Sequence, residues 1–194
     1  KKYKVSVWVN YIRRYDVGFR KLKKKLDDGV IGTLQYVGAF YTKGFRHNGS
    51  HMINLIYWLF GSIKEFQLSG LIDDSIYPSI SATLRTEVVA INLVALNYKY
   101  YELFELDIIG SKGRIIVKDG GQVILFESTV ENKFYSGYKN LSFDEKHDYS
   151  FGQCMGTGLN QGLSGYEMPS LDDELLLQRM IDEIECASHL KNRK

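Results

Sequence analysis

Two histidines stand four residues apart in the phrase His47-Asn48-Gly49-Ser50-His51, just before the most apolar segment of the chain. That segment, Ser50 to Phe60, is predicted to be a helix buried nearly all round, because it offers hardly any polar face before Gly61 ends it. With Ser50 as the N-cap, His51 lies in the first turn, where unpaired backbone amides and the helix dipole keep its ring neutral. A neutral imidazole can take a proton from an alcohol, so His51 is the candidate acid/base residue.

Other polar side chains near His51 could support this chemistry. Asn54 follows three residues later and shares a helix face with His51, so it could orient the imidazole or bind a substrate hydroxyl. His47 is expected to position His51 or the substrate, and Asn48 is a candidate substrate contact. The alternative, in which both histidines only cap a helix or satisfy a loop, stays open from the residues alone.

A metal site is a less favoured interpretation of the same histidines. His47 and His51 have the spacing of a zinc-binding pair, but Gly49 is expected to interrupt a continuous helix between them. No glutamate stands where the metalloprotease pattern requires one, so we expect no metal. A hydrolase built on His51 is less favoured still, because no nucleophile elbow can be recognised.

Two arginines, Arg13 and Arg14, follow a predicted strand over Val5 to Tyr11. Because adjacent strand residues face opposite sides, one of them is expected to point into the cleft side of the sheet and to hold an anion or hydroxyls. A surface salt bridge explains them equally well. Arg14 and Lys43 are taken as further candidate substrate contacts.

The composition excludes several kinds of partner. Lysine and arginine total 25 and aspartate and glutamate 23, so 25 − 23 leaves a net charge of +2, too small to indicate nucleic acid or an acidic membrane surface. The longest stretch without a charged residue, His47 to Ile63, is too short and contains too many polar residues to span a bilayer. Cys154 and Cys186 lie far apart without a Cys-x-x-Cys motif, which predicts reduced thiols in a cytoplasmic protein.

The glycine-rich phrase from Gly156 to Gly162 has the wrong spacing for a nucleotide-binding turn and follows no hydrophobic strand. We interpret it as a loop within a long excursion, from Asn132 to Pro169, that runs over the surface or over a cleft. The first residues carry no signal peptide and no initiator methionine, so we expect the chain to be cut from something longer.

The remaining segments predict an α+β fold. Asp16 is a suitable N-cap for an amphipathic helix that ends at Gly29, and Ser170 caps a closing helix. A strand is predicted over Thr33 to Tyr41. The other β-rich runs are Ile63 to Ile72, Ser81 to Asn97, Tyr101 to Ile109, Gly113 to Val117 and Gln122 to Glu127. Since long helices do not alternate with these strands, we expect one domain over residues 1–194, with an open, mostly antiparallel sheet and helices on one face.

Four phrases in the right order resemble the C-terminal domain of the glucose-fructose oxidoreductase and inositol dehydrogenase family of nicotinamide-dependent oxidoreductases. They are Val9 to Asp16, Asn48 to Gly61 with its glycine-x-histidine pattern, Glu105 to Ile115, and Pro169 to Asp173. The resemblance implies a sheet like that of the glyceraldehyde-3-phosphate dehydrogenase C-terminal domain, with one face commonly used for homo-oligomer formation. It also implies an N-terminal Rossmann domain, absent from this chain, that holds NAD or NADP.

In that family, the histidine that matches His51 accepts or donates a proton while hydride passes between substrate and nicotinamide. His47 and Asn54 stand where aspartates are commoner. The chain is therefore expected to be the substrate domain of an oxidoreductase acting on a sugar, a cyclic polyol or a nucleotide-linked sugar, with no cofactor-binding residues of its own. The alternative is a non-catalytic ligand-binding or assembly module, which the two replacements allow.

Overall fold

Eight strands form one mixed sheet in the computed structural model, which describes residues 9–72, 76–148, 156 and 171–191. The strands are β1 (Leu34–Tyr41), β2 (Glu65–Ile72), β3 (Ser79–Arg85), β4 (Ala90–Ala95), β5 (Phe104–Gly110), β6 (Gly113–Lys118), β7 (Val123–Glu131) and β8 (Lys139–Asp148). Their spatial order is β2-β3-β4-β1-β5-β6-β7-β8. Only the central β1–β4 pair is parallel, so the mostly antiparallel sheet predicted from the sequence is confirmed.

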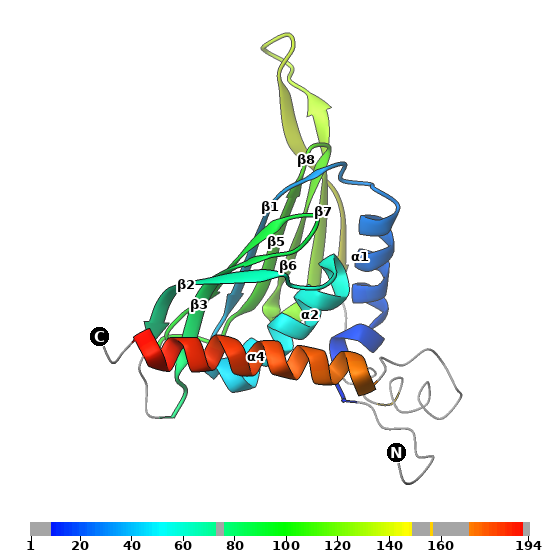
Figure 1. Cartoon of the computed structure of the whole chain (residues 1–194). Coiled ribbons are helices and arrows are strands. Elements are labelled where there is room, and N and C mark those ends of the chain that lie inside the picture. The colour runs from blue at the N-terminus through cyan, green and yellow to red at the C-terminus, as the bar shows by residue number, and fades with distance from the viewer. Residues whose placement is uncertain (1–8, 73–75, 149–155, 157–170, 192–194) are drawn as a thin grey trace.

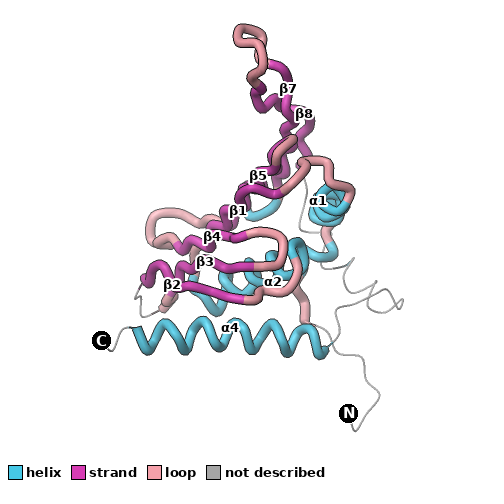
Figure 2. The backbone as a smooth tube through the Cα atoms, turned by 45° about the horizontal axis from the view of Figure 1, so that its top comes forward, coloured by secondary structure: helices cyan, strands magenta, loops and turns pink. Residues whose placement is uncertain are grey.

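In the described residues the structure gives bounds for the helices α1 (Val17–Asp27), α2 (Ser50–Phe60) and α4 (Leu171–Lys191), which lie on one face of the sheet (Figure 1). Three short turns of helix accompany them: η1 (Ile12–Tyr15), η2 (Gly44–Gly49) and η3 (Asp119–Gly121). Figure 2 shows α2 between the sheet and α4. Alternate strand residues point at these helices and form the core, as Val37, Ala39 and Tyr41 of β1 illustrate with no solvent exposure.

The predicted signals at the two ends of α1 and the apolar stripe of α4 are confirmed. The Asp16 carboxylate accepts hydrogen bonds from the Gly18 and Phe19 amides at 2.8 and 3.1 Å, and so caps α1. Gly29 follows α1 in the left-handed conformation, with φ of 68°. The apolar stripe of α4, Leu177, Ile181 and Ile184, is buried. The predicted cap Ser170 lies outside the described residues.

Three predictions about strands are wrong in part. Val9 to Tyr11 form no strand, because β1 already has β4 and β5 as neighbours and the chain instead turns into η1; residues 5–8 lie outside the described part. The run Ser81 to Asn97 is two strands, since the Thr86 hydroxyl accepts from the amides of Val88 and Val89 and closes a tight turn.

The third correction concerns the surface excursion predicted from Asn132. Its first part contains β8, which pairs with β7 in a long hairpin that projects from the body of the sheet (Figure 1). Few β8 side chains are buried, so the strand shows little hydrophobic periodicity in the sequence. Residues 149–155 and 157–170, which include most of the glycine-rich phrase, lie outside the described part.

The open face of the sheet carries a network of charged side chains. Arg114 donates two hydrogen bonds to the Asp107 carboxylate, both at 2.7 Å, and lies 3.7 Å from Glu127. Beside it, Tyr36 and Phe40 close over Gly38, where an added Cβ would lie within 3.1 Å of both side chains. This face is therefore partly aromatic, with its central charges paired internally.

None of the helices in the described residues combines the length and the hydropathy needed to cross a membrane.

Candidate functional site

The entry to α2 differs from the predicted one. The π-helical turn η2 runs straight into α2, and the Ser50 amide already donates to the Phe45 carbonyl. Ser50 is therefore not an N-cap, and its hydroxyl donates to the carbonyls of Arg46 and His47 at 3.0 and 2.8 Å. The prediction that the backbone amides at the start of this helix are unpaired is wrong, because η2 supplies a preceding turn of helix.

Gly49 does not interrupt the helix either. Its backbone is helical, with φ of −59° and ψ of −44°. A Cβ at this position would lie 3.1 Å from the rings of Phe45 and Tyr41, so close packing is the reason for glycine here. His47 and His51 consequently lie on one continuous helical segment, with ring centroids 6.4 Å apart.

His51 sits in a partly buried aromatic and cationic setting. The edge of the Tyr11 ring meets it at a centroid distance of 5.1 Å and an angle of 82°. Burial, and after it electrostatic repulsion by Arg13 and His47, lowers the pKa of His51 to about 4. This low pKa agrees with the neutral imidazole predicted from the sequence, but its causes are burial and these two neighbours rather than free amides of the helix.

Arg13 is held beside His51 by contacts with distant elements. Its Nε and Nη2 atoms donate to the Gly120 carbonyl at 3.2 and 2.9 Å, and its guanidinium lies 3.5 Å from the centroid of the Phe104 ring. Tyr11 and Arg13 thus form the wall of the site, a role that sequence reasoning missed for Tyr11. The neighbouring pair of arginines is the one signal that pointed to this segment.

Arg14 and Asn54 lie beneath the site and contact each other. Arg14 Nε donates to Asn54 Oδ1 at 2.8 Å, while Arg14 is 8% exposed and Asn54 1% exposed. The Asn54 oxygen therefore serves Arg14 and does not orient the His51 ring. Burial also removes Arg14 from the surface where a substrate contact was expected, and the strand orientation used to predict that contact is wrong because Arg14 belongs to η1.

Lys43 and Asn48 lie at the two ends of η2. Lys43 precedes this turn with a left-handed backbone, φ of 64°, and its ammonium pairs with Glu102. Asn48 is partly exposed on the turn between the two histidines. Both side chains are thus accessible from the same end of the sheet as His47, although neither has a contact that fixes a role in binding.

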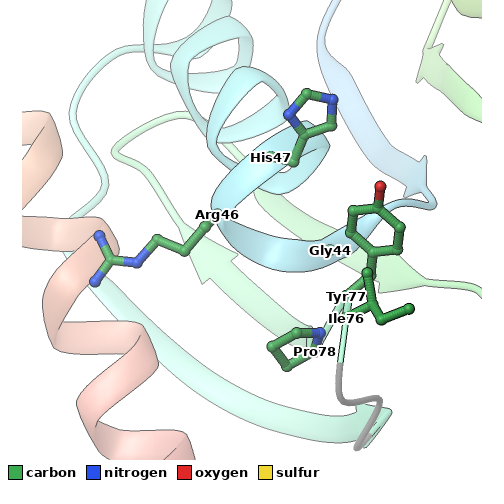
Figure 3. Close-up of a pocket in the computed structure, with 6 residues that line it drawn as sticks. All are labelled: Gly44, Arg46, His47, Ile76, Tyr77 and Pro78. Atoms are coloured by element: carbon green, nitrogen blue, oxygen red, sulfur yellow. The ribbon is translucent and has the colours of Figure 1, made fainter.

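A pocket of about 360 Å³ opens beside His47 (Figure 3). It is lined by Gly44, Arg46, His47, Ile76, Tyr77 and Pro78. The Tyr77 ring forms one wall and is braced edge-on by Tyr98 at 4.7 Å, while Arg46 extends to α4 and pairs with Asp182 and Glu185. His47 lines this pocket, and its ring centroid lies 6.4 Å from that of His51, which is not one of the lining residues.

The described residues form neither a metal centre nor a cofactor cradle. No three His, Cys, Asp or Glu side chains within them come close enough to hold a metal ion. Of the parallel pair β1 and β4, strand β1 leads through η2 into α2, but the glycines of this segment, Gly44 and Gly49, do not have the Gly-x-Gly-x-x-Gly spacing of a dinucleotide-binding turn.

Comparison with known proteins shows the fold. No protein-family model matches the chain, and no curated protein matches it in sequence. Solved structures, in contrast, match the chain in fold. A super-repressor mutant of Gal80p from Saccharomyces cerevisiae has a TM-score of 0.74 at 12% identity, covering 97% of this chain and 64% of its own.

Two enzymes show the same fold. KijD10, a 3-ketoreductase from Actinomadura kijaniata solved with NADP, has a TM-score of 0.66 at 18% identity, with 94% of this chain and 61% of its own covered. A putative myo-inositol dehydrogenase from Sinorhizobium meliloti has a TM-score of 0.64 at 20% identity, with 92% and 62% covered. The chain has the α+β fold that the resemblance implied, that of the C-terminal domain in these oxidoreductases, and it spans less than two thirds of their length.

Proposed function

We propose that this chain is the substrate-binding and oligomerisation domain of an NAD(P)-dependent oxidoreductase that acts on a sugar, a cyclic polyol or a nucleotide-linked sugar. The observation that carries the proposal is the partly buried imidazole of His51, whose low pKa keeps it neutral and which lies next to His47, a lining residue of the pocket of about 360 Å³. The oxidoreductase neighbours support the class of reaction. The exposed thiol of Cys186 fits a cytoplasmic location, which we include in the proposal.

His51 is proposed to exchange a proton with the reacting hydroxyl of the substrate. Its pKa of about 4 keeps the ring unprotonated at neutral pH, so a lone pair is available whenever substrate arrives. The nearby Arg13 charge disfavours the imidazolium that forms, which favours prompt release of the proton. The nicotinamide, held by a further domain, would take or give the hydride.

The pocket beside His47 is proposed to hold the rest of the substrate. The Tyr77 ring offers an apolar face to one side of a sugar, and the ring nitrogens of His47 can exchange hydrogen bonds with its hydroxyls. Asn48 and Lys43 are proposed as additional contacts at the rim. In this arrangement Asn54 has no direct contact with substrate, because it is buried.

The test is the variant His51→Ala in the protein expressed from its native start codon. Turnover of a sugar or polyol panel should fall about a hundredfold or more, while the affinity for NADH and NADPH stays nearly unchanged. His147→Gln is the matched control, since His147 belongs to β8, contacts Lys21 of α1 and Glu145 of its own strand, and does not line the pocket. Near-normal turnover of the His51 variant would contradict the acid/base role.

A non-catalytic module is the second candidate. A repressor mutant among the structural neighbours favours it, as does the absence of a carboxylate at positions 47 and 54. A fluorescence titration of NADH and NADPH against the protein from its native start codon separates the two candidates. Saturable binding with measurable turnover supports the oxidoreductase, whereas no binding of either nucleotide supports the module.

A further inference from the structure

We propose that Arg14, Asn54 and Glu174 form a buried clamp that positions the Tyr11–Arg13 segment against His51, with Glu174 as the positioning residue that supplies its carboxylate. The three residues come from η1, α2 and α4, and they lie far apart in the sequence. The effect on turnover rests on the proposed function of His51, whereas the effect on the His51 environment does not.

The clamp is built from a guanidinium with two polar partners. Besides the bond to Asn54 Oδ1, Arg14 directs Nη2 to the Asn54 carbonyl at 3.5 Å. Its Nη1 atom lies 3.6 Å from Glu174 Oε1. The Arg14 side chain is 8% exposed and that of Glu174 4% exposed, so both charges are almost withdrawn from water.

Withdrawing two charges from water is energetically unfavourable, and the pKa values of Arg14 and Glu174 reflect this. Burial lowers the pKa of Arg14 and raises the pKa of Glu174, in each case against the attraction of the partner charge. A buried ion pair contributes little net stability compared with apolar packing, so its value lies in fixing one arrangement. Because Asn54 is neutral, Glu174 is the carboxylate that can balance the Arg14 charge.

The geometry links this pair to His51. Arg14 shares the single turn η1 with Arg13, and its amide donates to the Tyr11 carbonyl at 3.1 Å. Tyr11 and Arg13 are two of the groups that surround the His51 ring. A displacement of the Arg14 guanidinium therefore shifts both the ring that shields His51 and the cation that repels its proton.

The experiment measures, by NMR at neutral pH, the nuclear Overhauser contacts between the Tyr11 and His51 rings in the chain and in three variants. Neutral pH is required because burial raises the pKa of Glu174, so a titration down to the His51 pKa of about 4 would itself protonate the clamp. Glu174→Gln leaves Arg14 without a carboxylate, and the contacts between Tyr11 and His51 should be lost as Tyr11 and Arg13 move away. The double variant Glu174→Gln/Asn54→Asp returns a carboxylate to the guanidinium at the position that now accepts its 2.8 Å bond, and it should restore these contacts.

Glu145→Gln is the control, because it removes an ion-paired glutamate from β8 and should leave His51 unchanged. The thermal melting of every variant is measured alongside, so that a general loss of stability is distinguished from a local change at His51. Unchanged Tyr11–His51 contacts in a folded Glu174→Gln variant, or the absence of rescue in the double variant, would overturn the clamp.

The two proposals fail separately. Loss of turnover in His51→Ala together with unchanged Tyr11–His51 contacts in Glu174→Gln removes the clamp and leaves the acid/base role. Contacts that are lost in Glu174→Gln and restored in the double variant, together with full turnover in His51→Ala, keep the clamp as a structural device and remove the catalytic proposal.

Discussion

At the scale of single residues, His51 should make stability depend on pH. Its pKa is about 4 in the folded chain against an ordinary value of 6.5, so the unfolded chain binds more protons between these values. The free energy of unfolding should therefore fall as pH drops from about 6.5 to about 4, by at most about 3 kcal/mol. Urea unfolding at pH values from 4 to 7.5 measures this effect.

The variant His51→Gln is the control for that measurement, because it cannot titrate. The difference in unfolding free energy between wild type and variant should change across this window and stay constant above pH 7. If the unfolding free energies of wild type and His51→Gln differ by the same amount at every pH from 4 to 7.5, the fold does not keep the His51 ring neutral.

The sequence identified His51 but not the residues that set its properties. A neutral ring could be inferred from the apolar helix that follows it, whereas the roles of Tyr11 and Arg13 depend on a turn that was predicted as strand. Glu174 could not be recognised at all, since nothing in the sequence relates the first turn of α4 to Arg14. Local patterns report hydrophobic faces, and they carry no information on which buried charges meet.

At the scale of elements, the start of α1 should depend strongly on its cap. Asp16→Ala removes the acceptor for two buried amides and should destabilise the chain by about 1–2 kcal/mol. Asp16→Ser, which keeps a hydroxyl acceptor, should recover most of this loss. Urea denaturation of the three proteins gives the comparison, and equal midpoints would contradict the capping role.

The start of α2 should behave in the opposite way. Ser50→Ala removes the hydrogen bonds from its hydroxyl to the two carbonyls of the preceding turn and its side-chain interaction with Tyr11, none of which caps an amide of α2, so stability should change by less than about 0.5 kcal/mol. A loss as large as that of Asp16→Ala, in the same denaturation series, would restore the N-cap predicted from the sequence. Asp16 and Ser50 are both residue types that favour the N-cap position. Only Asp16 acts as a cap, because at Ser50 the preceding turn η2 already continues the helix.

At the scale of the whole molecule, we propose that the open face of the sheet joins two copies of the chain. Arg114 is already paired with Asp107, so covering this face would not leave the Arg114 charge without a partner. Tyr36→Asp should weaken association at least tenfold, because it places an unpaired charge on the aromatic part of the face. Val17→Asp, at an exposed position on α1, is the control.

Analytical ultracentrifugation of the protein from its native start codon measures that association. A wild-type protein that sediments as a monomer at all concentrations would contradict the proposed interface. So would a Tyr36→Asp variant that associates as tightly as the Val17→Asp control.

The overall architecture was more predictable than its details. Period-two runs gave most strands of the sheet, and the apolar α2 indicated a covered face. The β3–β4 turn was missed because it lacks glycine and proline, and β8 was missed because most of its side chains are exposed. Side chains that face solvent on both sides of a strand leave no periodic signal.

The position of β1 has a consequence for how the chain folds. Val37 of β1 pairs with Ile91 of β4 on one side and with Ile108 of β5 on the other, and both partners follow much later in the sequence. The middle of the sheet therefore closes through contacts of high sequence separation, which places folding on the order of milliseconds or slower. During synthesis on the ribosome, β1 and the apolar α2 must wait for β5 to emerge, so the nascent chain is the state of this protein most exposed to aggregation and most in need of a chaperone.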